Sequence, residues 1–279
     1  MIETMPEIKP GQSIELLKEL HILTRDGKMN QDSRRKLKQI YHLHQFIEPL
    51  LKEVQSTQAS INLVDHGAGK SYLGFILYDL FFKQLDGAHH IYGIETRDEL
   101  VNKSVDLAKK LGFTGMSFLN QSVADSIDSA SLPKNIDLVT ALHACDTATD
   151  DAIRFALTRR AKFVILAPCC QAEVAAMLRK NKAKGSVTHY LGELWRHPLH
   201  TREFGSLLTN VLRCLQLEAH GYKVSVTELV GWEHSLKNEL IIARHDGLPR
   251  QRSADRLLEM LENLGLEELS QRFFCAREP

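Results

Sequence analysis

A short apolar run that ends in an acidic residue and two closely spaced glycines is the feature that most constrains this 279-residue chain. The run is Ile61–Asp65, and His66-Gly67-Ala68-Gly69 follows it directly before a stretch with helical spacing. A buried strand that turns sharply into a helix through glycines is typical of α/β folds, in which such a turn binds a ligand. We therefore expect a parallel sheet flanked by helices.

The rest of the chain repeats this alternation of short apolar runs and helical stretches. Five runs read as parallel strands, and two later runs are close enough to pair as an antiparallel hairpin. The pattern predicts an α/β fold with a Rossmann-like seven-stranded mixed sheet, helices on both faces and helical extensions at both termini. The predicted strands are Ile61–Asp65, His90–Glu95, Met116–Asn120, Ile136–Leu142, Phe163–Ala167, Lys223–Val230 and Glu239–Arg244, and predicted helices include Asp98–Leu111, Thr147–Arg159, Gln171–Lys182 and Arg202–His220.

Three regions are expected along the chain. Residues 1–58 read as an N-terminal helical extension, residues 59–246 carry the predicted sheet, and residues 247–279 form a Leu- and Glu-rich helical tail. The apolar run at 163–167 is far shorter than the about 20 residues that a membrane span needs, so no membrane partner is expected. Five cysteines, two of them adjacent, favour reduced thiols and a cytoplasmic location over a disulfide framework.

Three ligands use a glycine turn of this kind, and spacing and charge discriminate among them. A phosphate-binding P-loop needs a glycine where Val64 stands, and a dinucleotide-binding turn needs a third glycine where Tyr72 stands. S-adenosylmethionine has a cationic sulfur and an ammonium group, so the carboxylate of Asp65 favours it, whereas a triphosphate would be repelled. The turn therefore indicates S-adenosylmethionine.

A second acidic residue supports the same ligand. Glu95 ends the next predicted strand along the chain. A carboxylate at the end of that strand can accept hydrogen bonds from both hydroxyls of a ribose. The two signals together favour an adenosine-containing cofactor.

On these residues, the chain resembles the class I S-adenosylmethionine-dependent methyltransferases over about residues 60–245. Asp65-His66-Gly67-Ala68-Gly69 is similar to the first motif of that family, and Glu95 is similar to its ribose-binding acid. The family contacts adenine near the end of the third strand, where this chain has amides and hydroxyls. The resemblance implies a cofactor site made of Asp65, Gly67, Ala68, Gly69, Glu95, Gln121, Ser122 and His143.

Three further segments resemble a narrower subgroup, which includes tRNA ribose methyltransferases and uncharacterised relatives. They are Leu142–Asp150, Ala167–Gln171 and Glu233–Asn238. This resemblance implies an enzyme that modifies RNA.

The residues after the fourth and fifth predicted strands are the candidates for catalysis, because ligands bind at the carboxyl ends of parallel strands. His143 or Asp146 could accept a proton during methyl transfer to oxygen or nitrogen. Cys169, with Cys145 and Cys170 nearby, could instead attack a pyrimidine ring and activate its carbon. The alternatives are that Asp146 caps the helix beginning near Thr147 and that the cysteines are small buried apolar side chains.

A metal is not expected at these strand ends. Adjacent Cys169 and Cys170 fit the usual Cys-x-x-Cys zinc spacing badly, and the His-x-Glu motif of zinc deaminases is absent at His143.

The charge distribution makes RNA the expected substrate. The chain has 35 basic and 35 acidic residues, a balance that excludes indiscriminate coating of nucleic acid. The stretch from Arg179 to Arg202, however, contains six basic residues and one acidic residue, Glu193. Aromatic and imidazole side chains are interspersed among them, which suits contacts to phosphates and bases. Residues 34–38 form a second basic cluster. A protein or small-molecule methyltransferase and a non-catalytic cofactor-binding module are the alternatives.

Overall fold

Seven strands form one mixed sheet in the computed structural model, which describes residues 7–142, 144–168, 171–183, 190–229 and 239–275. The strand order is β3-β2-β1-β4-β5-β7-β6. Strands β1 to β5 are parallel, and β7 is antiparallel to both β5 and β6. The predicted fold class is therefore confirmed. The strands are β1 Asn62–His66, β2 His90–Glu95, β3 Met116–Asn120, β4 Leu138–Ala141, β5 Phe163–Leu166, β6 Tyr222–Glu228 and β7 Glu239–His245.

Helices cover both faces of the sheet. One apolar cluster joins α1 to α4 to the sheet, and a second joins α5, α6 and part of α8 to the other face. Among the described residues, no helix is long and apolar enough to cross a membrane. The helices are α1 Ile14–Glu19, α2 Gln31–Thr57, α3 Tyr72–Leu80, α4 Asp98–Leu111, α5 Val123–Ser126, α6 Thr147–Arg159, α7 Glu173–Ala183, α8 Pro198–Ala219 and α9 Gln251–Asn263, with short 3-10 turns at Phe82–Gln84, Tyr190–Trp195 and Glu267–Leu269.

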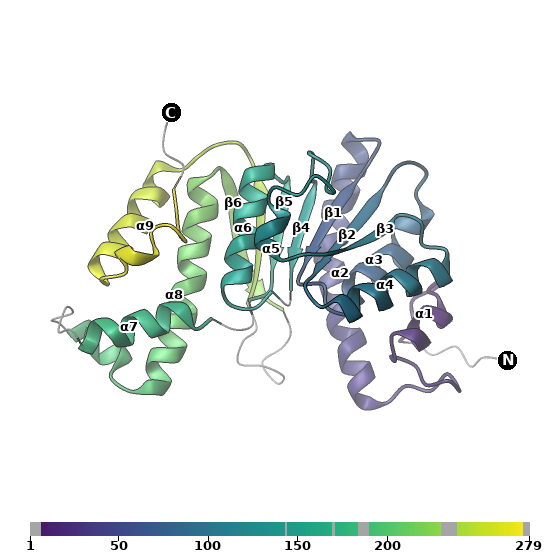
Figure 1. The fold of residues 1–279 in the computed structure, drawn as a ribbon, viewed down its shortest axis with the longest axis horizontal. Helices are drawn as coiled ribbons and strands as arrows, with labels where there is room; N and C mark the ends of the chain where they lie inside the picture. Colours follow the sequence, from purple (N-terminus) through teal and green to yellow (C-terminus); the bar gives the residue numbers. More distant parts are fainter. Residues whose placement is uncertain (1–6, 143, 169–170, 184–189, 230–238, 276–279) are drawn as a thin grey trace.

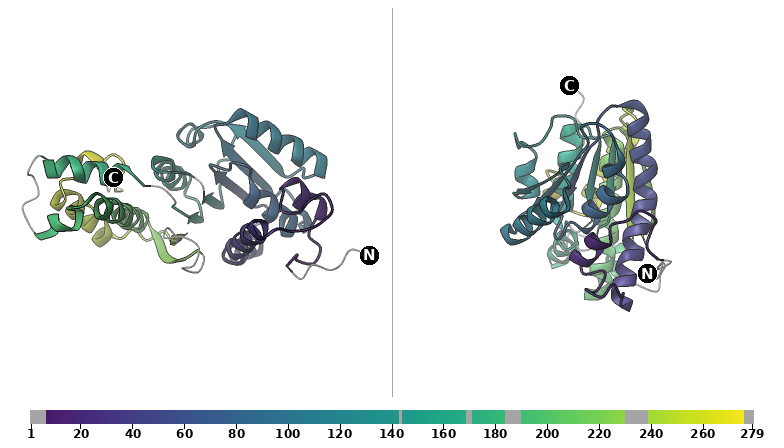
Figure 2. Two further views of the ribbon diagram at one scale, coloured as in Figure 1. Left: turned by 90° about the horizontal axis from the view of Figure 1, so that it is seen from below. Right: turned by 90° about the vertical axis from the view of Figure 1, so that its right-hand side faces the viewer.

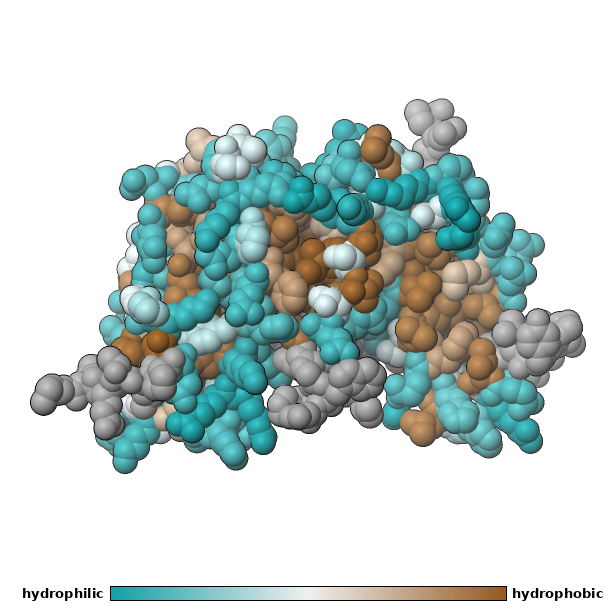
Figure 3. Space-filling view, turned by 180° about the vertical axis from the view of Figure 1, so that it is seen from behind, coloured by the Kyte–Doolittle hydropathy of each residue, from teal (hydrophilic) through white to brown (hydrophobic). Residues whose placement is uncertain are grey.

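A third apolar cluster lies beyond the sheet, where α7, α8 and α9 pack on one another. Figure 1 shows these helices at one end of the molecule and α1 at the other, and the left view of Figure 2 shows the same arrangement from below. Apolar surface is also visible on the back of the molecule, towards the end that carries α7 to α9 (Figure 3). Exposed apolar side chains of α8 include Leu199, Leu207 and Val211.

A buried carboxylate anchors the N-terminal segment to α3. Asp79 is fully buried, and its Oδ2 accepts the main-chain N–H of Ser13 at 2.8 Å. Its Oδ1 accepts Lys83 Nζ at 2.5 Å, and the same ammonium donates to the carbonyl of Gly11. Pairing satisfies the buried charge and fixes the approach of the chain to α1.

A fully buried arginine of α8 binds the first turn of α6 and the loop residue that precedes it. Arg213 Nε donates to Asp150 Oδ1 at 2.6 Å, and Nη2 donates to Asp150 Oδ2 at 3.1 Å. The same Nη2 donates to the main-chain carbonyl of Asp146 at 2.9 Å, and Nη1 donates to Asn210 Oδ1 at 3.3 Å. Arg213 has 0% exposure and Asp150 5%. Because the guanidinium presents its donors in a rigid plane, it holds the 146–150 segment in one position against α8.

We expect Arg213→Met to destabilise the protein by about 3–5 kcal/mol, because the Asp150 carboxylate would stay buried without a cation. The measurement is the free energy of unfolding from urea titration. Arg202→Met is the matched control, since Arg202 lies on the same helix in an exposed pair with Glu203 and should cost about 1 kcal/mol or less. Equal losses in the two variants would contradict this account of the buried pair.

Candidate functional site

The glycine turn after β1 adopts the backbone conformation that its sequence predicts. Gly67 and Gly69 have φ angles of 65° and 58°, in the left-handed region that only glycine adopts without strain. The amide of Ala68 donates to the carbonyl of Ile94 at 3.0 Å, which joins the turn to the end of β2. The loop between β1 and α3 is therefore held against the carboxyl end of the neighbouring strand.

Glu95, the predicted ribose-binding acid, lies at this junction. Its Oε2 accepts the amide N–H of Gly69 at 2.8 Å, and its Oε1 accepts the amide N–H of Arg97 at 3.0 Å. The Arg97 side chain also donates to both carboxylate oxygens, from Nε at 2.9 Å and from Nη2 at 3.1 Å. The Arg97 side-chain bonds, followed by these amides, lower the pKa of Glu95 to about 2. The carboxylate is therefore charged throughout the physiological pH range.

A cleft of about 350 Å³ opens beside Glu95, at the carboxyl ends of β1 to β4. The amide of Gln121 donates to the carbonyl of Glu95 at 3.2 Å, which places the ends of β2 and β3 side by side. The side-chain nitrogen of Gln121 is buried and has no hydrogen-bond partner among the described residues. An unpaired buried donor at the wall of a cleft is suited to a ligand acceptor. The cleft is lined by Gly67, Ile94, Glu95, Thr96, Arg97, Gln121, Ser122, Val123, Ala124, Ala144, Cys145, Thr147, Ala148 and Asp151.

Ser122 has a structural role besides its place in the cleft wall. Its hydroxyl accepts the amide N–H of Asp125 at 3.0 Å and so caps α5. The same hydroxyl donates to Asp125 Oδ2 at 2.6 Å. The Ser122 side chain is thus already engaged, whereas the Gln121 amide nitrogen is not.

Asp65 lies below the cleft and does not line it. Its side chain is buried between β1 and β4, where Oδ1 accepts the Thr140 hydroxyl at 2.6 Å. Burial raises the pKa of Asp65 to about 6, and the Thr140 bond only partly opposes that shift. No cationic side chain pairs with Asp65 in the described part of the chain. A nearby cation would favour the charged form of this carboxylate.

Asp146 does not cap the helix that follows it, so that alternative is wrong. Its Oδ1 instead accepts the amides of Ala172 and Glu173, at 3.0 and 3.4 Å, and so binds the start of α7. Its φ angle of 51° is strained for a residue other than glycine. The bond from Arg213 to its carbonyl helps to hold this conformation. Asp146 therefore joins the ends of β4 and β5.

Two predicted catalytic residues, His143 and Cys169, lie outside the described residues, as does Cys170. Cys145 is exposed and lines the cleft beside Glu95. Within the described ranges, no group of three or more His, Cys, Asp or Glu side chains is arranged to hold a metal ion.

Sequence reasoning missed two charged residues of the cleft. Arg97 is two positions after Glu95, and nothing in that spacing indicated an ion pair. Asp151 lines the opposite wall, and burial raises its pKa. Arg272, from the C-terminal segment, pairs with both Asp151 at 3.4 Å and Glu173 at 3.3 Å. The partner of Asp151 is thus more than a hundred residues away in the chain and has no local sequence signal.

A second cavity lies where the predicted basic stretch folds. It has a volume of about 520 Å³ and is formed by α7 and the first turns of α8. Arg179 is exposed at its wall and has no ion-pair partner among the described residues, whereas Arg202 pairs with Glu203 at 2.9 Å. Gln171, which directly follows the cysteine pair, also lines this cavity. Two cationic side chains therefore line this cavity.

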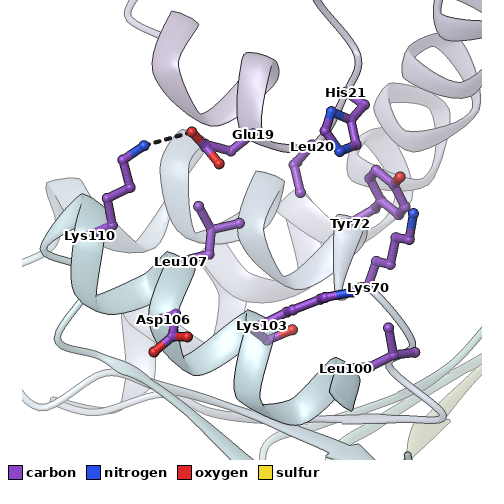
Figure 4. Close-up of a pocket in the computed structure, with 11 residues that line it drawn as sticks. Glu19, Leu20, His21, Lys70, Tyr72, Leu100, Lys103, Asp106, Leu107 and Lys110 are labelled. Carbon is purple, nitrogen blue, oxygen red and sulfur yellow. Dashed lines mark hydrogen bonds and ion pairs between the residues drawn. The ribbon is translucent and has the colours of Figure 1, made fainter.

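A third cavity, of about 360 Å³, lies between α1 and α4 (Figure 4). Lys70 and Tyr72, which follow the glycine turn, line one side of it. Lys110 on the other side is paired with Glu19 at 2.6 Å. This cavity includes none of the predicted cofactor or catalytic residues.

Solved structures with similar folds include several methyltransferases. Magnesium protoporphyrin IX methyltransferase from Synechocystis PCC 6803, with bound SAH, has a TM-score of 0.46 and 14% identity over 84% of this chain and 95% of that chain. An rRNA methylase from Streptococcus thermophilus has a TM-score of 0.43 and 10% identity, over 72% and 94%. Fibrillarin from Aeropyrum pernix, with natively bound S-adenosyl-L-methionine, has a TM-score of 0.40 and 12% identity, over 66% of each chain. No curated protein matches the sequence.

The sequence also matches a known protein family. The model of a methyltransferase domain family matches residues 35–177, which is just over half of the chain and extends from α2 to α7. This segment contains the glycine turn, Glu95 and the cleft residues, and its strands are ordered as a Rossmann-like methyltransferase requires. The expectation of a class I S-adenosylmethionine-dependent methyltransferase is confirmed as far as the family is concerned. The chain belongs to this methyltransferase family.

Proposed function

We propose that this methyltransferase holds S-adenosylmethionine in the cleft beside Glu95 and transfers its methyl group to RNA. The proposed cofactor residues are Asp65, Gly67, Ala68, Gly69, Glu95, Gln121, Ser122 and His143. The observation that carries the proposal is the charged Glu95 carboxylate, bound to the Gly69 amide at the rim of a cleft of about 350 Å³.

The described residues fit this cofactor chemically. Ribose hydroxyls are donors, and the Glu95 carboxylate is an acceptor at the cleft wall. The unpaired amide nitrogen of Gln121 is a donor that an adenine nitrogen can satisfy. Asp65 supplies a buried carboxylate near the turn. A cationic ligand nearby would stabilise the charged form of this carboxylate.

The cofactor supplies a methyl group on a sulfonium, which is a good leaving group, so the protein's task is mainly alignment and proton removal. His143 and Asp146 are the proposed proton acceptors for transfer to oxygen or nitrogen, and Cys169 is the proposed nucleophile if the target is a pyrimidine carbon. Asp146 is held by the α7 amides and by Arg213, which gives a carboxylate at the end of β4 a defined position.

RNA is the proposed substrate because cationic side chains line the cavity formed by α7 and the first turns of α8. Arg179 and Arg202 are exposed there, next to Gln171. A guanidinium group can form bidentate hydrogen bonds with phosphate oxygens, which suits contacts to an RNA backbone. Transfer of tritiated methyl groups into fractionated RNA, with protein fractions in parallel, tests the substrate class.

We expect Glu95→Gln to weaken binding of S-adenosylmethionine by about 10- to 100-fold, because hydrogen bonds to a charged acceptor are lost. Calorimetric titration of the folded variant measures this. Glu99→Gln is the matched control, since Glu99 is exposed on α4 and pairs with Lys103. Unchanged affinity in Glu95→Gln would refute the cofactor site.

We expect binding of S-adenosylmethionine to release protons from Asp65 near pH 6. Its pKa is about 6 without a ligand, and a bound cation lowers it, so affinity should rise with pH between about 5 and 7. Calorimetry in two buffers with different ionisation enthalpies measures the released protons. In Asp65→Asn, the release should disappear, and persistence of the same release would show that another group titrates.

We expect Arg179→Ala with Arg202→Ala to weaken RNA binding and to reduce the slope of log affinity against log salt by about 1.4 for single-stranded RNA. Filter binding across a salt series measures this. Arg256→Ala is the charge-matched control, because Arg256 is exposed on α9 and does not line the cavity. If Arg256→Ala had the same effect per charge removed, the cavity would not be the RNA site.

A further inference from the structure

The acid proposed to bind the cofactor ribose is already saturated by the protein's own donors. Each oxygen of Glu95 accepts one main-chain N–H, from Gly69 or Arg97. Each also accepts one bond from the Arg97 guanidinium, at 2.9 and 3.1 Å, and the Thr96 hydroxyl adds a longer contact at 3.4 Å. A carboxylate has about four favourable acceptor positions. Two ribose hydroxyls cannot add their bonds while the guanidinium stays in place.

The guanidinium also takes space beside the glycine turn. A Cβ atom at Gly69 would lie 3.7 Å from Arg97 Nη2. The Arg97 side chain therefore lies directly beside the backbone of Gly69. Arg97 lines the same cleft as Glu95 and Gly67. The room that the glycines leave for a ligand is therefore partly filled by this arginine.

Only the side chain of Arg97 needs to move for the acid to become available. It is 66% exposed, and Glu95 is its only ion-pair partner among the described residues. The two main-chain amides would keep Glu95 in position after the guanidinium has left. Water can satisfy the exposed guanidinium after it leaves, and the ribose hydroxyls would take its place on the buried Glu95 carboxylate, so the exchange leaves no charge without partners.

We propose that Arg97 competes with the ribose of the cofactor for Glu95 and thereby sets the affinity for S-adenosylmethionine. This inference rests on the proposed function, since it takes Glu95 as the ribose acceptor. In the absence of cofactor, the guanidinium closes the ribose position, and cofactor binding displaces it towards solvent. The fraction of molecules with Arg97 displaced multiplies the intrinsic affinity.

The test is calorimetric titration of the full chain with S-adenosylhomocysteine, which has the same ribose and no net charge. We expect Arg97→Ala to bind it about three- to tenfold more tightly than the unmodified protein, because the competing pair is gone. Arg97→Lys should fall between the two, since an ammonium cannot bind both carboxylate oxygens as a guanidinium does. Lys103→Ala, which removes an exposed cation of α4 outside the cleft, should leave affinity unchanged.

Salt supplies a second, independent measurement. Between about 50 and 500 mM salt, screening weakens the Arg97–Glu95 pair, so affinity of the unmodified protein for S-adenosylhomocysteine should rise. Affinity of Arg97→Ala should not rise over the same range.

The outcomes separate this inference from the proposed function. Weaker or equal binding by Arg97→Ala, while Glu95→Gln still weakens binding, would overturn the competition and leave the cofactor site in place. No effect of Glu95→Gln, or no binding by any variant, would overturn the proposed function and this inference with it.

Discussion

The hydrogen bond from the Gly69 amide to the Glu95 carboxylate is the interaction on which the candidate site depends. It joins the loop after β1 to the end of β2, and the parallel register of those strands brings the two groups to the same edge of the sheet. The amide can point at the carboxylate because Gly67 and Gly69 adopt left-handed backbone angles. Any side chain at either position would strain the turn and detach it from the acid.

Two buried aspartates, Asp150 and Asp65, differ in whether the protein supplies a cation for them. Asp150, in the first turn of α6, pairs with the fully buried guanidinium of Arg213, and this pair holds α6 against α8. Asp65 has only the Thr140 hydroxyl, and burial raises its pKa to about 6. A carboxylate that the protein leaves without a cation is the one that a cationic cofactor can complete.

The sheet was predictable because buried parallel strands read as short apolar runs. The bounds of β2, β3, α4 and α6 agree with the prediction to the residue. Helix α8 begins at Pro198 rather than at the predicted Arg202, because proline is well tolerated in a first helical turn.

The positions of Glu95 and the glycine turn were also predictable, since Glu95 ends one predicted strand and the turn directly follows another. Contacts between distant segments were not. Asp146 reads locally as a cap for its own helix, yet it binds amides 26 and 27 residues later. Arg213 lies in the middle of a predicted helix, where burial of a guanidinium has no signature in the spacing of apolar residues. The Arg272 pair joins segments that meet only in the folded protein, and the Arg97 pair depends on a side-chain conformation that the sequence does not specify.

Arg213 lies outside the part of the chain that defines the family, although it binds two residues inside that part. The segment that matches the methyltransferase family ends at residue 177, before this arginine. A fragment that ends at residue 177 would contain Asp146 and Asp150 without Arg213, so the Asp150 carboxylate would lack its cation and the strained turn at Asp146 would lose one of its bonds. Such a fragment would contain every residue that lines the cleft beside Glu95, but not the arginine that fixes the segment after β4.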